Sequence, residues 1–191
     1  SAPGGCVNRV SRFTMSGAVT GAGALELSVM HVRADITANF SAFTGQINVT
    51  PNTNAMTVVG GITPITAFDF RSANNAGYPN ARLHLGANDI YAASMYSRAA
   101  ANAQVPIGEL SGDPGTSLRS TSGGGGSPGA NETWVIGGLN TDATFAGTLL
   151  DGNSFVKVGT GKWTLTAVNT HTGNTSISNG VVSLEGDGST T

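Results

Sequence analysis

Apolar and polar residues alternate over short runs through most of the chain. Residues 13–49 contain the runs FTMSGAVTG, ALELSVMHVRADI and FTGQINV, and later come MTVVGGI, ITAFDFR, ARLHLG and IYAASMY. Alternation over about four to eight residues is typical of a strand that buries one face. Residues that favour sharp reversals separate the first runs, at 21–23, 37–39 and 51–54. The pattern therefore predicts many short strands joined by tight turns.

Two segments depart from this alternation. Residues 92–103 are rich in alanine, which favours a short helical turn there. Residues 112–130, GDPGTSLRSTSGGGGSPGA, contain almost no apolar residue and predict a flexible loop. Neither segment divides the chain, because 191 residues are an ordinary length for one all-β domain. We therefore expect a single domain over residues 1–191.

The alternation becomes more regular after residue 130. The runs TWVIGG, TFAGTLL, FVKVG, WTLTAV, NTSIS and VVSLEG follow one another with Gly, Asn or Asp between almost all of them. One alternating coil hides only one face, so coils must stack on one another. The runs recur at about 20 to 25 residues per full turn, which is the spacing of β-helix coils with three short faces. Antiparallel sandwiches also use short strands, and alternation alone does not exclude one.

Residues 145–184 read FAGTLLDGNSFVKVGTGKWTLTAVNTHTGNTSISNGVVSL. This segment closely resembles the autotransporter-associated β-strand repeat, in which a phrase like "kvGtGtltLtg.nTytG.T.i..G.l.l" recurs. His171 stands where the phrase usually has an aromatic ring. The resemblance implies a right-handed parallel β-helix in an exported bacterial protein. The strings VPIGELSGDPGT, WVIGGLNTDATFAG and FSAFTGQINV are similar to segments of large secreted bacterial proteins, which often carry polysaccharide-degrading domains elsewhere.

Stacked coils make specific demands on the repeat. We expect the inward side chains to be aliphatic, namely Val156, Val158, Leu165, Ile177 and Val182. The corners should fall at residues that tolerate positive φ, namely Gly159, Gly161, Gly173 and Gly180. Trp134 and Trp163 lie at strand positions, where packing against the neighbouring coil is the favoured role.

Composition agrees with an exported all-β protein. Charged residues make up 10% of the chain, against about 25% in an average soluble protein, and 28 residues are glycine. The net charge of -2 comes without basic runs, which argues against nucleic-acid binding. Cys6 is the single cysteine, so an internal disulfide framework is excluded. No apolar run approaches the roughly 20 residues that span a bilayer. We expect a secreted or cell-surface segment of a larger protein, and a monomer.

Catalytic patterns are weak in this chain. Glycoside hydrolysis needs two suitably spaced carboxylates, but many acids lie in turn contexts, such as Asp113, Asp151 and Asp187. The histidines, at 31, 84 and 171, lack metal-site spacing. The string GGSPG at residues 125–129 fits G-x-S-x-G only as part of the Gly-rich loop, so no nucleophile elbow is predicted, and nothing in the sequence pairs a serine with a histidine and an acid. We predict no catalytic residues, no metal and no cofactor.

A candidate binding surface comes from paired charges in the first half of the chain. Arg33 with Asp35, and Asp69 with Arg71, are spaced so that both members point to the same face of a strand. Each pair is either a local ion pair or part of a polar strip for sugar hydroxyls and uronate carboxylates. Exposed tyrosines could stack on pyranose rings. The predicted ligand-binding residues are Arg33, Asp35, Asp69, Arg71, Asn75, Tyr78 and Tyr91.

These observations leave three functions in order of preference. The first is a non-catalytic accessory module that binds polysaccharide or cell-surface glycan. The second is a structural stalk or adhesin passenger segment. The third is a fragment of a polysaccharide lyase or glycoside hydrolase, which the short chain disfavours because such enzymes usually need more coils to form a substrate cleft.

Overall fold

The computed structural model of the chain describes residues 12–29, 33–51, 67–72, 76–89, 92–97, 102–119 and 132–186, and these form strands and turns without a helix. The strands are β1 (Arg12–Met15), β2 (Ala18–Gly21), β3 (Ala24–Val29), β4 (Arg33–Ile36), β5 (Asn39–Phe43), β6 (Gln46–Pro51), β7 (Ala67–Ser72), β8 (Tyr78–Leu85), β9 (Ala92–Ser97), β10 (Gln104–Gly112), β11 (Ser117–Arg119), β12 (Thr133–Ile136), β13 (Ala143–Phe145), β14 (Thr148–Leu149), β15 (Ser154–Lys157), β16 (Lys162–Leu165), β17 (Thr175–Ile177) and β18 (Val181–Leu184).

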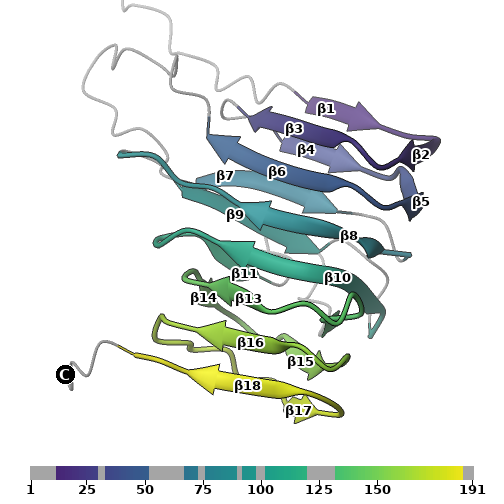
Figure 1. Cartoon of the computed structure of the whole chain (residues 1–191). Helices are drawn as coiled ribbons and strands as arrows, with labels where there is room; N and C mark the ends of the chain where they lie inside the picture. Colours follow the sequence, from purple (N-terminus) through teal and green to yellow (C-terminus); the bar gives the residue numbers. More distant parts are fainter. Residues whose placement is uncertain are drawn as a thin grey trace, which may run out of the picture.

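All pairings between these strands are parallel. One sheet has the order β1-β4-β7-β9-β11-β14, a short sheet pairs β2 with β5, and a third sheet contains the other strands. Figure 1 shows successive coils stacked along one axis, from β1 at one end to β17 and β18 at the other. The predicted parallel β-helix is confirmed, and a sandwich is excluded because its sheets are antiparallel.

The third sheet branches at the long strand β10. It runs through β3, β6 and β8 to β10. The start of β10 then pairs with β12, whereas its last residue, Gly112, pairs with Phe145 of β13. The chain turns between β12 and β13 at Gly137 (φ 107°) and Asn140 (φ 64°). Beyond β10 the sheet therefore continues as two columns, β12-β15-β17 and β13-β16-β18.

Coil length agrees with the predicted period. Contacts between neighbouring coils join residues 20 apart at Thr160 and Asn140, 21 apart at Thr172 and Asp151, and 23 apart at Thr44 and Gly21. The step is longer between β11 and the turn after β14, where contacting residues are 32 apart.

One continuous apolar core fills the solenoid. Register places Trp134 between Val105 and Phe155, and Trp163 beside Ala143 and Val182. Both indoles are buried, and the Trp163 ring nitrogen donates to the Leu110 carbonyl oxygen at 3.1 Å. The expectation that both tryptophans pack against neighbouring coils is confirmed. Burying one large apolar side chain contributes about 1.5–3 kcal/mol, so this core stabilises the stack.

The predicted inward set needs a correction in β15. Phe155 and Lys157 face inward, whereas Val156 and Val158 are only half-buried. The assignment of Val156 and Val158 was wrong because the register pairs Lys157, rather than a valine, with inward Ile136. A lysine stem can line an apolar interior while its ammonium reaches polar atoms. Here the ammonium donates to the carbonyl oxygens of Val158 and Gly159.

The corner glycines are needed for two different reasons. Gly159 (φ 68°) and Gly180 (φ 74°) adopt the left-handed conformation that was predicted. Gly161 and Gly173 do not, but a Cβ atom would lie 2.1 Å from the Thr141 oxygen and 2.1 Å from the Asn153 oxygen, respectively. Close approach of backbones, rather than φ, requires glycine at these two positions.

Two local predictions were wrong. Residues 92–97 form strand β9 instead of a helical turn, because pairing with β7 and β11 outweighs the helix propensity of alanine. Residues 98–101 of the predicted segment lie outside the described residues. Within the predicted loop 112–130, Gly112 ends β10 and residues 117–119 form β11, which pairs with β9 and β14. The rest of that segment, 120–130, lies outside the described residues.

Candidate functional site

Strand register in the six-stranded sheet brings predicted site residues into one row. Register places Asp35 beside Arg71, Arg71 beside Tyr96, and Tyr96 beside Arg119. Asp69 lies two residues away, beside Ser94. The two acid–arginine pairs found in the sequence therefore meet at Asp35 and Arg71, on the neighbouring strands β4 and β7.

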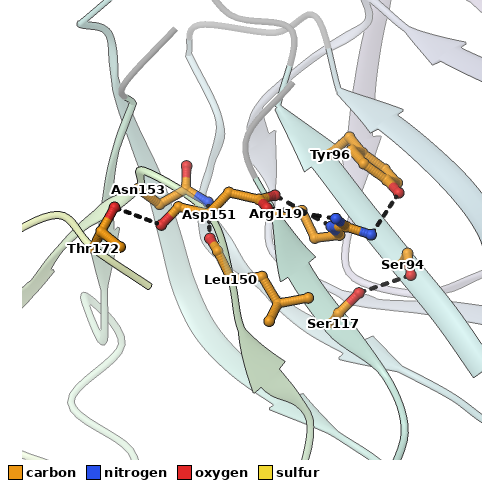
Figure 2. A network of polar contacts seen from close by, with 8 residues as sticks. All are labelled: Ser94, Tyr96, Ser117, Arg119, Leu150, Asp151, Asn153 and Thr172. Carbon is orange, nitrogen blue, oxygen red and sulfur yellow. Dashed lines mark hydrogen bonds and ion pairs between the residues drawn. The ribbon is translucent and has the colours of Figure 1, made fainter. Parts of the chain in front are cut away.

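Figure 2 shows the end of this row, which we call the Arg119 clamp: Tyr96, Arg119 and Asp151. The Arg119 guanidinium donates from Nε to Asp151 Oδ2 at 3.2 Å, from Nη2 to Oδ1 at 3.4 Å, and from Nη1 to the Tyr96 hydroxyl at 3.3 Å. Its Cζ lies 5.4 Å from the Tyr96 ring centroid. The hydrogen bond that Arg119 donates to Asp151 raises the pKa of Arg119, and partial burial opposes this shift. The forked geometry favours a fixed ion pair.

The clamp is continuous with backbone contacts of the next coil. Asp151 adopts a positive φ of 65° after β14, and its carbonyl oxygen accepts from the Thr172 amide at 2.8 Å. The buried Asn153 side chain donates to the Leu150 carbonyl oxygen at 3.0 Å, and the hydroxyls of Ser94 and Ser117 lie 2.7 Å apart (Figure 2). Both carboxylate oxygens of Asp151 are engaged, so the clamp chiefly joins coils.

The sequence suggested that Tyr78 lies in an exposed turn, but the structure buries it. It begins β8, is fully buried and packs its ring 5.0 Å from that of Phe40. Strict alternation from Leu83 and Leu85 would turn Tyr78 outward, but a register shift in the pairing of β8 with β10 interrupts the alternation, which explains the error. Its ring is therefore covered by protein and cannot stack on a sugar in this structure.

Ligand binding by the other predicted residues stays a prediction. Asn75 and Tyr91 lie outside the described residues. Arg33, Asp35, Asp69 and Arg71 are placed by the backbone of β4 and β7. Their register fits a polar strip, and binding by that strip stays a prediction.

Sequence reasoning missed a serine, a histidine and an acid that meet on the outer side of the third sheet. His84 Nδ1 lies 3.0 Å from Ser111 Oγ, and His84 Nε2 lies 3.6 Å from Asp113 Oδ1. Ser111 is the register partner of His84 although the two are 27 residues apart. Only strand pairing, which the sequence does not specify, reveals this cluster.

The geometry of this cluster suits a contact between coils better than an activated nucleophile. A catalytic serine needs a base that a carboxylate orients through a hydrogen bond, but 3.6 Å is too long for one. Asp113 Oδ2 instead accepts from the Ala87 amide at 3.0 Å, and the Asp113 carbonyl oxygen accepts from Thr116 Oγ1 at 2.6 Å. Asp113 thus stabilises the turn after β10.

Further polar pairs cross the outer face of the same sheet. Arg82 Nε lies 3.4 Å from Glu109 Oε2, and that carboxylate also accepts from the Thr141 hydroxyl. Nearer the first coil, Asn48 bonds to Gln46 and Glu26. Cross-strand pairs of this kind contribute roughly 0.2–1 kcal/mol each. They form a ladder between coils.

His171 occupies the position at which the repeat phrase usually has an aromatic ring. Its ring packs edge-on to Phe155 at 4.8 Å between centroids, and Nε2 lies 2.8 Å from Thr175 Oγ1. Burial lowers the pKa of His171 and also that of Lys157, where the charge of Asp142 opposes the shift. Both titratable groups therefore take part in packing.

Neither metal chemistry nor a membrane helix is indicated by the described residues. They contain no cluster of three or more His, Cys, Asp or Glu side chains suited to a metal ion. They also contain no helix of the length and apolarity needed to cross a bilayer.

The fold defines the class of the protein as a parallel β-solenoid. Comparison with protein families then shows that residues 155–184 match the Passenger-associated-transport-repeat. This confirms the predicted passenger-type repeat, which spans β15 to β18 and begins later than the predicted residue 145. No curated protein and no solved structure matches the chain.

Proposed function

We propose that the chain is a structural passenger segment, a β-helical stalk of a secreted or surface-exposed bacterial protein. The observation that carries the proposal is the coincidence of the matched repeat, residues 155–184, with coils in which stacking accounts for the glycines and inward side chains. A stalk needs a continuous core and regular coil contacts. It needs no pocket, metal or nucleophile.

The polar side chains support the same proposal. The described groups with catalytic or binding potential are engaged between coils, as in Arg119–Asp151, Arg82–Glu109 and His84–Ser111. Groups that satisfy one another have little capacity left for a ligand, because replacing such bonds recovers only a small net free energy. We therefore propose a non-catalytic segment that acts without a cofactor.

Two assays test this function directly. The chain should bind no member of a glycan array, and a fluorophosphonate probe should not label Ser111. Specific glycan retention would favour a binding module over a stalk. Labelling that disappears in both Ser111→Ala and His84→Ala would contradict the non-catalytic proposal.

Polysaccharide binding is the second candidate, and the register of Asp35 with Arg71 favours it. The outer side of β4 and β7 would then offer carboxylates and guanidinium groups to sugar hydroxyls or uronates. Arg71→Ala should weaken retention on insoluble polysaccharide without lowering the Tm. Arg82→Ala, on the other large sheet, is the matched control and should leave retention unchanged.

A further inference from the structure

The corner between β17 and β18 contains the dipeptide Asn179–Gly180. Asn179 is the only asparagine of the sequence that is followed by glycine, whereas Asn140 and Asn169 are both followed by threonine. Glycine has no Cβ atom, so no side chain on Gly180 shields its backbone nitrogen from the side-chain amide of Asn179. These two groups can therefore react with one another.

The folded corner holds the two groups together. The Gly180 backbone N–H donates to Asn179 Oδ1 at 2.8 Å. Because the Cγ carbon is bonded to Oδ1, the carbon that a nucleophile would attack is kept beside the Gly180 nitrogen. The side-chain oxygens of Asn140 and Asn169 instead accept from the amides of Thr160 and Leu149, at 2.9 Å and 2.8 Å. Only at Asn179, among these three asparagines, does the side chain turn to its own following amide.

Water has access to this corner. Asn179 is exposed, and so are Asn140 and Thr160 at the corresponding corners of the two preceding coils. Those corners are followed by further coils, β15–β16 and β17–β18, and are exposed all the same. The exposure of Asn179 therefore belongs to the corner position in each coil.

A positive charge also lies beside Gly180. A Cβ atom built on Gly180 would lie 2.9 Å from the Lys157 Nζ atom, and that ammonium donates to the Gly159 carbonyl oxygen at 3.0 Å. A nearby cation favours the deprotonated form of an amide and stabilises negative charge that develops during nucleophilic attack. Lys157 thus assists a reaction in which the Gly180 nitrogen is the nucleophile.

We propose that Asn179 is a site of spontaneous deamidation, which the folded corner promotes. Hydroxide removes the Gly180 amide proton, and the nitrogen forms a bond to Asn179 Cγ. The bond from Cγ to the side-chain nitrogen breaks, and this nitrogen takes a proton from water and leaves as ammonia. Water then opens the resulting succinimide at either carbonyl carbon and gives aspartate or isoaspartate. No oxidant or reductant is needed.

The isoaspartate product should disturb the corner. It inserts one additional carbon atom into the main chain before Gly180, where even a Cβ atom would overlap the Gly159 carbonyl oxygen. It also adds a carboxylate close to Lys157. The modification therefore marks the age of the folded segment, whether that segment acts as a stalk or binds glycan.

Peptide mapping by mass spectrometry, combined with enzymatic methylation of isoaspartate, tests the proposal on the full folded chain incubated at mildly alkaline pH. Asn179 should convert at least about tenfold faster than Asn140 or Asn169, because its reacting groups are already in contact. Asn179→Gln should abolish the isoaspartate signal of this peptide. Lys157→Met, checked for folding by circular dichroism, should slow conversion at Asn179.

The matched control is Thr141→Gly, which creates a second Asn–Gly pair at the corner of an earlier coil. Its Asn140 side chain is still engaged by the Thr160 amide, so conversion there should stay several-fold slower than at Asn179. Equal rates at the two Asn–Gly pairs would overturn the proposal, because sequence alone would then set the rate. Conversion of Asn179 that requires unfolding in urea would overturn it as well.

Discussion

The early coils, residues 12–119, and the repeat coils, residues 132–186, use the same architecture with different regularity. Contacts between repeat coils join residues 20 or 21 apart, as at Asp142–Lys162, Ser154–Asn174 and Asp151–Thr172. In the early coils the separation is 22 at Thr37–Met15 and 27 at His84–Ser111. The regular separation in the repeat coils places a glycine at the same corner of successive coils. The variable separation in the early coils allows the outer-face side chains to differ from coil to coil.

Ion pairs of the described residues are found mainly in the early coils and at their junction with the repeat coils. Arg82–Glu109 and His84–Asp113 lie within the early coils, and Arg119–Asp151 joins them to the repeat coils. The repeat coils instead rely on backbone bonds, corner glycines and side-chain caps such as Asn140 to the Thr160 amide. The difference teaches that, in the described residues, the repeat coils are joined by backbone contacts and corner glycines, whereas side-chain pairs contribute more between the early coils.

Tyr78→Ala should give the largest effect, because it removes a buried ring from the early core. Loss of a large aromatic core side chain costs about 3–5 kcal/mol. Chemical denaturation would measure the change, with Tyr78→Phe as the control that keeps the ring. A free energy of unfolding within error of the original for Tyr78→Ala would contradict the predicted contribution of the buried ring to the early core.

Gly173→Val should come next, since the new side chain would meet the Asn153 backbone. Overpacking of this kind costs about 1–3 kcal/mol. The matched control in the early coils is Gly23→Val, because a Cβ atom there meets nothing within 4 Å. Equal losses in the two variants would contradict the view that the repeat depends on close backbone approach.

Arg119 and Asp151 should show a smaller coupling across the junction of the two regions. A double-mutant cycle with Arg119→Ala and Asp151→Asn isolates the pair. Both side chains are partly exposed, so about 0.2–1 kcal/mol is expected, falling with added salt. Strict additivity of the two changes would mean that the clamp contributes nothing to joining the regions.

We predict a small dependence of stability on pH that arises from His171 in the repeat coils. Burial lowers its pKa in the folded chain, so the unfolded chain binds more protons as the pH falls below about 6.5. Stability conferred by neutral His171 should decline from that pH down to the folded pKa. His171→Phe should lessen this decline in thermal unfolding at several pH values, and an unchanged slope would contradict the assignment.

Sequence alone predicted the architecture because stacking leaves a strong pattern. Alternation, spacing and the glycines at 159 and 180 pointed to coils and corners, and the resemblance of residues 145–184 to a known repeat favoured a β-helix over a sandwich. The same alternation misassigned Val156 and Val158, since a lysine can face inward when its ammonium finds carbonyl oxygens at a corner.

The site was harder to predict than the fold, because it depends on which strands pair and in which register. Tyr78 was misjudged because it is buried through a register shift in β8 that sequence alternation does not reveal. The contact of His84 with Ser111 was missed because 27 residues separate them and only register brings them together. Asp35 and Arg71 were each identified within a pair on a single strand, yet their adjacency to one another also required the pairing of β4 with β7.

Small-angle X-ray scattering on a series of lengthened chains tests the central claim, that this segment is a stalk built by stacking coils. Residues 166–185 would be repeated one, two and three times after Glu185. Each copy should increase the maximum dimension by about 4.8 Å, the spacing of neighbouring strands, with an unchanged cross-section. A dimension that stays constant while the cross-section or the disordered fraction grows would contradict the account.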